Sequence, residues 1–468
     1  MVIQNAPELA QHGNVEGRRA VLQILEAGLQ AADPYENVRK LVRVERGRLI
    51  VGHKDLPERL GRGPLVFDLA SVGHIYVIGG GKAAHRQAKA LEDALGDLIT
   101  EGHVNAKKGD TVQLRRIGVT LAGHPIPDED SVAGASQIVD IARRARKGDI
   151  VFHSESGGGS ALLTLPAPGV TLQDLRDVNR ILYFECGATM WDTNAVRNML
   201  TLLRSREPRH VGEATYIQVS TDERPPGLRV PAVGRDYTNR LGAASYTYAR
   251  DVLKRYRCWD RMPEAVKAFL NAADPQYWPL APQEWEQNPW YYFRVMGPEH
   301  MLEAALRKGE ELGINTAVLA SSLSDVEARP AAETLAYIGQ EIELFGRPMK
   351  PPAALLCGGE LLVTVGPAKG SGGRNQEFVL SAATRIAGSK RIVVASVDSD
   401  GADGPTDMAG GIVDGHTMER AAAADLDVFA ELAEHNSGAV LRRLGDSIST
   451  GIQGTNVQDL RVVYVAGA

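Results

Sequence analysis

The chain has 468 residues, of which 44% are hydrophobic, 24% charged and 6% aromatic. This length and composition fit two or three globular domains and exclude wholesale disorder. The net charge of −6 provides no broad basic field for a phosphate backbone, which excludes nucleic acid as the main partner. The 49 glycines follow no collagen period and are typical of α/β enzymes whose loops bind phosphates through backbone N–H groups.

Cysteine usage and hydropathy predict a soluble, cytoplasmic protein without a membrane partner. Cys186, Cys258 and Cys357 are far apart and odd in number, which excludes a disulfide framework or a CxxC metal site and fits a reducing compartment. Residues 1–32 lack the basic and apolar regions of a signal peptide and predict an amphipathic helix instead. No run of about 18 apolar residues occurs, so we expect no membrane span.

Apolar runs alternate with segments of helical periodicity along most of the chain. Strands are expected at 74–79, 149–154, 214–220, 316–321, 353–360, 391–396 and 460–465. Helices are expected at 82–95, 135–146, 172–198, 299–312, 331–345 and 376–386. This alternation predicts an α/β fold of two lobes, with mainly parallel sheets flanked by helices and a cleft between the lobes.

Two glycine turns follow the first two predicted strands, where ligands gather in open α/β sheets. In Gly79-Gly80-Gly81-Lys82 the backbone N–H groups at a helix start favour anions, and Lys82 adds a positive charge. Neither a P-loop nor the GxGxxG dinucleotide pattern is present, and a tight turn with a surface lysine is the alternative. In Ser156-Gly157-Gly158-Gly159-Ser160 three glycines between hydroxyls form a candidate anion nest, without the GxSxG spacing of a serine hydrolase. A plain loop is the alternative here.

Two further polar loops lie in the C-terminal half. Lys369, Gly372, Gly373 and Arg374 surround a helix start, where arginine suits bidentate contact with phosphate or carboxylate. Glu360 either holds a metal or pairs with Arg374. Asp403 and Asp407 belong to an acidic loop, 398–407, whose oxygen ligands would suit Mg²⁺, with a solvated acidic turn as the alternative.

Taken together in chain order, these motifs resemble the type II glycerate kinases (glycerate 2-kinases, also called hydroxypyruvate reductases). The matching segments include Gly79–Lys82, 124–128 (His-Pro-Ile-Pro-Asp), 156–163, Asn194-Ala-Val-Arg197, Gly358–Glu360, 372–377, 403–407 and 454–460. The family joins an N-terminal Rossmann-like domain to a C-terminal leucine-rich domain. By this resemblance we expect domains at 1–260 and 349–468, with a connecting segment at 261–348.

The resemblance implies ATP-dependent phosphorylation of a glycerate hydroxyl with Mg²⁺, on a small hydroxy-acid substrate. Lys82 and Arg374 would be catalytic, and the two glycine turns with Lys369, Gly372 and Gly373 would bind the nucleotide and phosphates. Asn194, Arg197 and Asn375 would bind the substrate, and Asp222, Glu360, Asp403 and Asp407 would serve the metal. A homodimer is a possible assembly. We also expect loops 154–160 and 369–377 to face one cleft, because phosphoryl transfer holds donor and acceptor together.

The chain departs from the family pattern in one wall of the expected substrate pocket. After Arg197 the family continues with Lys-His-Leu-Ser and a Lys-Gly-Gly-Arg turn, whereas this chain carries Arg204 and Arg206 in segment 198–208. Asp222 is only an approximate counterpart of a family aspartate. We therefore expect an acid other than D-glycerate to be preferred, unless both arginines point into solvent. An oxidoreductase of the hydroxypyruvate type and a non-catalytic acid-binding homologue remain alternatives.

Overall fold

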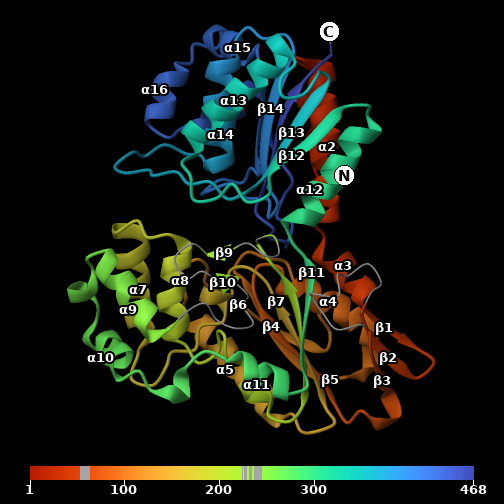
Figure 1. The fold of residues 1–468 in the computed structure, drawn as a ribbon, viewed down its shortest axis with the longest axis vertical. Helices are drawn as coiled ribbons and strands as arrows, with labels where there is room; N and C mark the ends of the chain where they lie inside the picture. Colours follow the sequence, from red (N-terminus) through yellow and green to blue (C-terminus); the bar gives the residue numbers. More distant parts are fainter. Residues whose placement is uncertain (53–63, 224, 226–228, 231–234, 237–244, 468) are drawn as a thin grey trace. The chain divides into compact units, whose positions relative to one another are not determined.

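In a computed structural model, which describes residues 1–52, 64–223, 225, 229–230, 235–236 and 245–467, the chain forms two compact units (Figure 1). The central unit comprises Pro34–Asp222 and Pro226–Val295, and the terminal unit comprises Met1–Asp33, Glu223–Pro225 and Met296–Ala468. The boundaries of these units differ from those of the expected domains 1–260 and 349–468 and of the expected connecting segment 261–348. The reason is that the N-terminal helix and the segment from Met296 onward pack with the C-terminal sheet.

The central unit contains a six-stranded sheet with the strand order β11-β8-β7-β4-β5-β6. Its strands are β4 (Ile75–Gly80), β5 (Ile99–Lys107), β6 (Ile117–Ala122), β7 (Ile150–Glu155), β8 (Thr215–Thr221) and β11 (Trp290–Met296). From β8 to β6, neighbouring strands pair in parallel. Strands β4 and β7 are buried along their whole length, as continuous apolar runs predict. The parallel pairing brings their glycine turns to the same edge of the sheet.

Helices and two small sheets complete the central unit. The α-helices are α3 (Pro34–Leu41), α4 (Ala84–Leu95), α5 (Glu129–Arg144), α6 (Gly159–Leu162), α7 (Leu172–Asn179), α8 (Met190–Met199), α9 (Tyr246–Arg255), α10 (Glu264–Ala272) and α11 (Pro282–Gln287). The small sheets comprise β1 (Val42–Glu45), β2 (Arg48–Val51) and β3 (Leu65–Asp68), and β9 (Arg229–Val230) with β10 (Arg235–Asp236). The helix expected at 172–198 is interrupted: a π-helical segment, Arg180–Glu185, follows α7, and Gly187 adopts a φ of +64° before Thr189 caps α8.

The terminal unit contains a second six-stranded sheet, with the order β12-β13-β17-β14-β15-β16. Its strands are β12 (Asn315–Ala320), β13 (Ala353–Gly359), β14 (Ile392–Asp398), β15 (Gly410–Asp414), β16 (Ser447–Ile448) and β17 (Asp459–Val465). Only β12 and β13 pair in parallel, and β17 lies antiparallel between β13 and β14. The expectation of mainly parallel sheets therefore holds for the first sheet, whereas the second is mixed. As a result, the first residue of β17 lies beside the last residues of β13 and β14.

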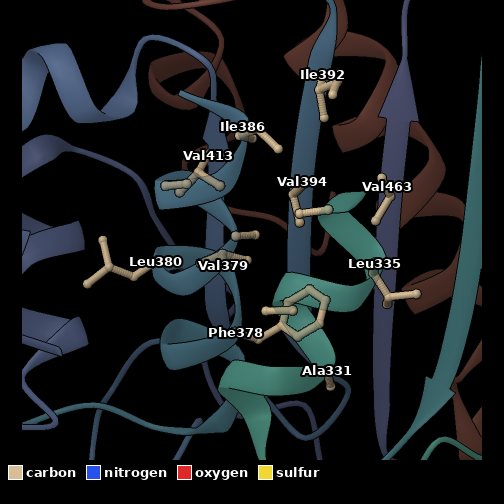
Figure 2. Packing of buried hydrophobic residues seen from close by; sticks show 14 of the residues in the cluster. Ala331, Leu335, Phe378, Val379, Leu380, Ile386, Ile392, Val394, Val413 and Val463 are labelled. Carbon is tan, nitrogen blue, oxygen red and sulfur yellow. The ribbon is translucent and has the colours of Figure 1, made fainter. Parts of the chain in front are cut away.

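Helices cover both faces of this second sheet (Figure 1). They are α1 (Ala6–Leu9), α2 (Val15–Ala31), α12 (Pro298–Glu311), α13 (Ala328–Phe345), α14 (Arg374–Ile386), α15 (Thr417–Ala423), α16 (Val428–Ala433) and α17 (Ser437–Leu444). Figure 2 shows how Leu335 of α13 and Phe378 of α14 pack with Val394 and Val463 of the sheet. The predicted N-terminal helix is α2, which packs against α12, β14 and β17. It is anchored by the fully buried Arg18, whose Nε lies 2.5 Å from Asp414.

Within the described ranges, no helix is both long and apolar enough to cross a membrane.

Candidate functional site

The two predicted glycine turns of the central unit meet at the carboxyl ends of β4 and β7. Gly79 pairs with Ser154 in the sheet, and a Cβ atom at Gly79 would lie 2.1 Å from the Ser154 carbonyl oxygen, so only glycine fits there. The Lys82 N–H donates to the Gly157 carbonyl at 2.9 Å, and the Ala83 N–H donates to Ser156 Oγ at 2.8 Å. The Ser156 hydroxyl therefore fastens the second turn to the start of α4.

Lys82 lies beside this second turn. A Cβ atom at Gly158 would lie 3.2 Å from Lys82 Cγ and 3.1 Å from the ring of His124. Gly158 itself adopts a φ of +86° at the start of the short helix α6. Three predicted motifs, 79–82, 124–128 and 156–160, thus lie together. Backbone N–H groups at helix starts next to a lysine are an arrangement that attracts anions.

Helix α8 carries the predicted substrate residues Asn194 and Arg197 and contacts the same turn through Asn198. Ser160 Oγ donates to Asn198 Oδ1 at 3.2 Å. Arg197, only 7% exposed, donates to Asn179 Oδ1 at 3.2 Å and forms no ion pair with a carboxylate among the described residues. Burial, and next the charge of Arg204, lower the pKa of Arg197 to about 10. Asn194 lies one turn earlier on α8, and its buried Oδ1 accepts no hydrogen bond from the described residues. Within the part of the chain that the structure describes, Arg197 is therefore a buried cation without a compensating anion.

Both arginines of the divergent segment are buried, so the alternative that they point into solvent does not hold. Arg204 is 5% exposed and forms an ion pair with Glu155, the last residue of β7. Arg206 is 3% exposed and donates to the carbonyls of Asn198, Thr201 and Arg204 at 2.8, 2.9 and 3.0 Å. Arg206 thus holds the chain that follows α8. It does not supply the extra guanidinium that was expected to select a larger acid.

Arg204 belongs to a buried polar network that the sequence did not predict. Glu207 Oε1 lies 3.8 Å from Arg204 Nη1, and Gln218 of β8 donates to Glu155. A Cβ atom at Gly159 would lie 2.9 Å from Arg204 Nη1, so the network lies directly under the second glycine turn. Glu155 precedes a motif that was recognised, but nothing in the sequence indicated that its partner would come from segment 198–208.

Glu207 gives the free energy of unfolding a pH dependence. Burial raises the pKa of the Glu207 carboxyl to about 7, against the opposing charge of Arg204. Between the ordinary pKa of 4.5 and about 7, the folded chain therefore holds a proton that the unfolded chain has lost. The free energy of unfolding should fall as pH rises through this window, by at most about 1.4 kcal/mol per pH unit for one proton. Glu207→Gln should flatten this fall in urea unfolding measured at several pH values, and identical pH profiles for the two proteins would contradict it.

Asp222 lies at the exit of β8, in the central unit. Its Oδ1 accepts from Ser220 Oγ at 2.7 Å, and its Oδ2 accepts from Tyr292 Oη at 2.6 Å and Arg294 Nε at 3.1 Å. Both carboxylate oxygens therefore already have donors within the protein.

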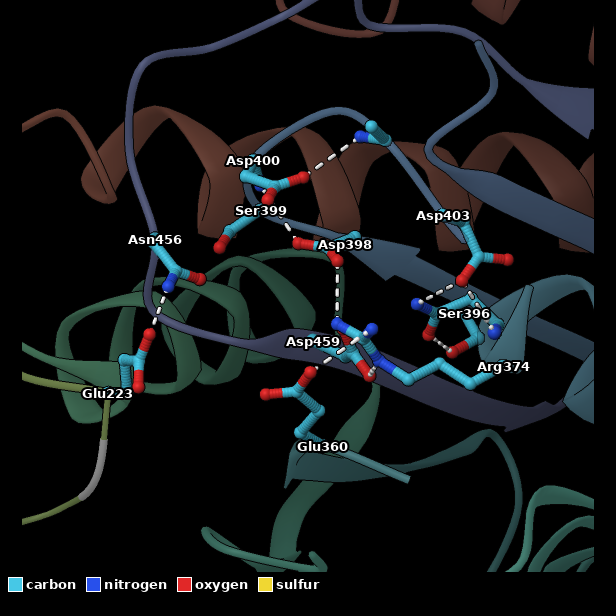
Figure 3. Close-up of polar contacts among 12 residues, drawn as sticks. Glu223, Glu360, Arg374, Ser396, Asp398, Ser399, Asp400, Asp403, Asn456 and Asp459 are labelled. Atoms are coloured by element: carbon cyan, nitrogen blue, oxygen red, sulfur yellow. Dashed lines mark hydrogen bonds and ion pairs between the residues drawn. The ribbon is translucent and has the colours of Figure 1, made fainter. Parts of the chain in front are cut away.

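In the terminal unit, Arg374 begins α14 and lies among three carboxylates at the ends of β13, β14 and β17 (Figure 3). Its Nη1 lies 3.1 Å from Glu360, its Nη2 2.6 Å from Asp398, and its Nε 2.9 Å from Asp459. Burial alone would lower the pKa of Arg374, but Asp459, Glu360 and Asp398 outweigh it and hold that pKa well above its usual value. Glu360 was expected as one partner. Asp398 and Asp459 were not, because the direction of β17 was unknown.

Asp403 fixes the start of α14 and hence the position of Arg374. The fully buried Asp403 carboxylate accepts from the N–H groups of Asn375 at 3.0 Å and Gln376 at 2.8 Å, and from both of their side-chain amides. A Cβ atom at Gly373 would lie 2.3 Å from Asp403 Cγ. Asn375, expected to bind substrate, is fully buried and also accepts from the Ser396 hydroxyl.

The glycine loop before α14 is fastened to the chain around residue 436. The Gly370 N–H donates to the Glu434 carbonyl and the Ser371 N–H to Asn436 Oδ1, both at 3.0 Å. Gly372 packs against Ser437, whereas Lys369 is exposed and forms no ion pair with a described residue. The loop therefore has a fixed backbone, and Lys369 makes no ion pair within the described ranges.

The four carboxylates expected to hold Mg²⁺ each already have a partner within their own unit. Asp222 belongs to the central unit, whereas Glu360, Asp403 and Asp407 belong to the terminal unit. Asp407 is 71% exposed and pairs with Arg442, and both oxygens of Asp403 cap α14. No group of three or more His, Cys, Asp or Glu side chains suited to a metal ion occurs in the described part of the chain. The donors present therefore do not fit a cage for Mg²⁺ made of protein ligands alone.

Comparison with known proteins identifies this arrangement of sheets and turns. Residues 20–205 match the family model described as Domain of unknown function (DUF4147), and residues 353–459 match the MOFRL family. A crystal structure of glycerate kinase from Thermotoga maritima is similar with a TM-score of 0.76 and 28% identity, covering 96% of this chain and 99% of that one. The fold is thus an α/β fold that matches a glycerate kinase structure.

Sequence relatives define the family. A glycerate 2-kinase from Pyrococcus horikoshii is 34% identical over 449 residues, which cover 96% of this chain and 97% of the relative. A D-glycerate 2-kinase from Thermotoga maritima is 33% identical over a region that spans 83% of this chain and 90% of the relative. A protein from Agrobacterium vitis named putative hydroxypyruvate reductase is 32% identical over a region that spans 84% of this chain and 100% of the relative. The chain belongs to the glycerate kinase family.

Proposed function

We propose that the protein is an ATP-dependent kinase that phosphorylates a hydroxyl group of glycerate or of a related small sugar acid. The observation that carries this proposal is Arg197, a buried guanidinium without a carboxylate partner among the described residues. Arg197 lies on α8, whose Asn198 contacts the glycine turn 156–160, and Lys82 lies beside the same turn. A buried charge is costly unless an opposite charge compensates it. A substrate carboxylate supplies that charge, and Arg197 would hold it while Lys82 faces the phosphoryl oxygens.

Arg374 is proposed as the second catalytic cation. Asp398 and Asp459 are buried and fix its Nη2 and Nε, whereas Glu360, which faces Nη1, has a side chain 44% exposed. Phosphoryl oxygens would replace Glu360 at Nη1, and the two buried carboxylates would keep the guanidinium plane in place. Fixed cations of this kind stabilise the charge of the phosphoryl group in the transition state.

The proposed donor is ATP, and Mg²⁺ would accompany it. Because the described residues contain no cage of carboxylates for the ion, no step of the proposal depends on protein-bound magnesium. Mg²⁺ in kinases is held largely by substrate phosphates and water, together with one or two carboxylates.

The experiment is to incubate the protein with ATP, Mg²⁺ and a panel of hydroxy acids, and to measure ADP release. Acid-dependent ADP release supports the kinase. Oxidation of NADH with hydroxypyruvate would instead support a reductase, the activity in the name of the Agrobacterium vitis relative. Binding of acids without either reaction would support a non-catalytic homologue.

Replacing Arg197 should weaken substrate binding more than the chemical step. A hydrogen bond to a charged group contributes about 1.5–3 kcal/mol, so Arg197→Ala should raise the KM for the acid roughly 10- to 100-fold. The control is Arg143→Ala, an exposed arginine of α5 in the same unit, which should leave KM unchanged. Steady-state kinetics at saturating ATP separates KM from kcat. An unchanged KM in Arg197→Ala would contradict the assigned role.

A further inference from the structure

Two of the three cysteines lie together in the central unit, although they are far apart in the sequence. Cys186 follows the π-helical segment and Cys258 follows α9, and both belong to one apolar cluster with residues of α7, α8 and α9. Cys258 is fully buried, and its Sγ donates to the Leu253 carbonyl at 3.4 Å. Burial, and the hydrogen-bonded thiol of Cys186, raise the pKa of the Cys258 thiol to about 11. The two sulfurs are therefore neighbours, and Cys258 is the less reactive one.

The chain on either side holds the two cysteines in place. The Arg261 N–H donates to the Cys258 carbonyl at 3.1 Å, and Arg261 Nη1 donates to Cys186 Sγ at 3.7 Å. Tyr256 Oη donates to Asp192 of α8 at 2.9 Å, and Arg255 donates to the same carboxylate at 2.6 Å. The segment before α8 and the end of α9 are thus joined by several polar contacts, and Arg261 contacts both cysteines.

The surroundings of the two thiols differ. Cys186 is partly exposed, whereas Cys258 is fully buried among apolar side chains. An oxidant in solution therefore reaches Cys186 first. Cys258 is then placed as the second thiol, which attacks the oxidised sulfur.

We propose that Cys186 and Cys258 form a reversible intrachain disulfide when the protein meets a peroxide. The Cys186 thiol loses its proton as its sulfur attacks a peroxide oxygen, and the O–O bond breaks. A sulfenic acid forms, and the leaving oxygen takes up the thiol proton as water or an alcohol. The Cys258 sulfur then attacks the Cys186 sulfur, the S–O bond breaks, and the released hydroxide takes up the Cys258 proton as water. The two thiols lose two electrons and the peroxide gains them. A dithiol reductant reverses the reaction by thiol–disulfide exchange.

The test is to treat the full-length protein with hydrogen peroxide, alkylate the remaining thiols and map the peptides by mass spectrometry. The wild type should retain one of its three thiols, at Cys357, and yield a linked peptide pair that contains Cys186 and Cys258. Dithiothreitol should restore all three thiols. Cys357, which is 2% exposed in the other unit, is the internal control, and Cys357→Ser should still form the disulfide.

The single variants test which sulfur reacts first. Cys258→Ser should accumulate oxidised acids at Cys186, and Cys186→Ser should keep both of its remaining thiols. Three intact thiols in the treated wild type would overturn the proposal. So would oxidation of Cys186 to its acids without a linked peptide, or disulfides formed only between chains. This test does not depend on kinase activity.

Discussion

Lys82→Ala is expected to lower kcat by roughly 10²–10³ and to leave the fold intact. Removing one group that faces the charge developing in a transition state has an effect of this size. The Lys82 side chain lies beside Gly158, just before α4, next to the turn proposed to bind the phosphoryl group. The reason for the intact fold is that the backbone N–H of residue 82, rather than its side chain, makes the bond that joins the two glycine turns.

The matched control is Lys89→Ala. Lys89 lies on α4 and pairs with Asp93 at the surface. This variant should keep wild-type kcat, because exposed pairs of this kind contribute little. Both variants are compared by ADP release at saturating substrates and by thermal unfolding. A Lys82→Ala variant with normal kcat would remove Lys82 from the mechanism, and one with normal kcat and raised KM would make it a binding residue.

Arg374→Lys should lower kcat by a similar factor, roughly 10²–10³, while most of the charge balance of the site is retained. Lysine keeps one positive charge but presents no planar fork, so it cannot contact Glu360, Asp398 and Asp459 at the same time. Alanine is the poorer test. It would remove the guanidinium from the buried Asp398 and Asp459, although Arg461 would still pair with Asp459. Taking one partner out of a buried ion pair costs about 3–5 kcal/mol in stability.

Arg385→Lys is the control for this second variant. Arg385 lies on the same helix, pairs with Glu333 at the surface, and is 42% exposed. It should behave as the wild type in both kcat and thermal unfolding. If Arg374→Lys retained full kcat, a positive charge alone would be sufficient, and the proposed contact between the guanidinium and the phosphoryl oxygens would be wrong.

The strands that carry the glycine turns were predictable because they are continuous apolar runs followed by glycine. Strands β5 and β6 were not predicted: β5 begins Ile-Thr-Glu-Gly-His, and the polar residues conceal the strand. The helix 172–198 was predicted without its interruption at Gly187. The packing of α2 on the second sheet depends on contacts with β14, β17 and α12, which no local pattern in residues 1–32 indicates.

The parts of the candidate site that consist of a single sequence motif could be predicted. The contacts between segments far apart in the sequence could not. Gly79–Lys82 and Ser156–Ser160 were recognised singly, and the structure brings them together in the central unit. The ion pair of Arg204 with Glu155 and the cap that Asp403 provides for α14 join segments whose proximity only the fold determines. Whether loops 154–160 and 369–377 face one cleft stays a prediction.

Transfer of the terminal phosphate of ATP to an acid can be followed directly with radiolabelled γ-phosphate and D-glycerate, followed by separation of the products. Wild-type protein is expected to move the label into a phosphorylated acid, in amounts equal to the ADP formed. Lys82→Ala and Arg374→Lys should each reduce the initial rate of that transfer roughly 10²–10³-fold. Label that remains in ATP, or that appears only as inorganic phosphate, with D-glycerate and with every other hydroxy acid of the panel, would contradict a kinase.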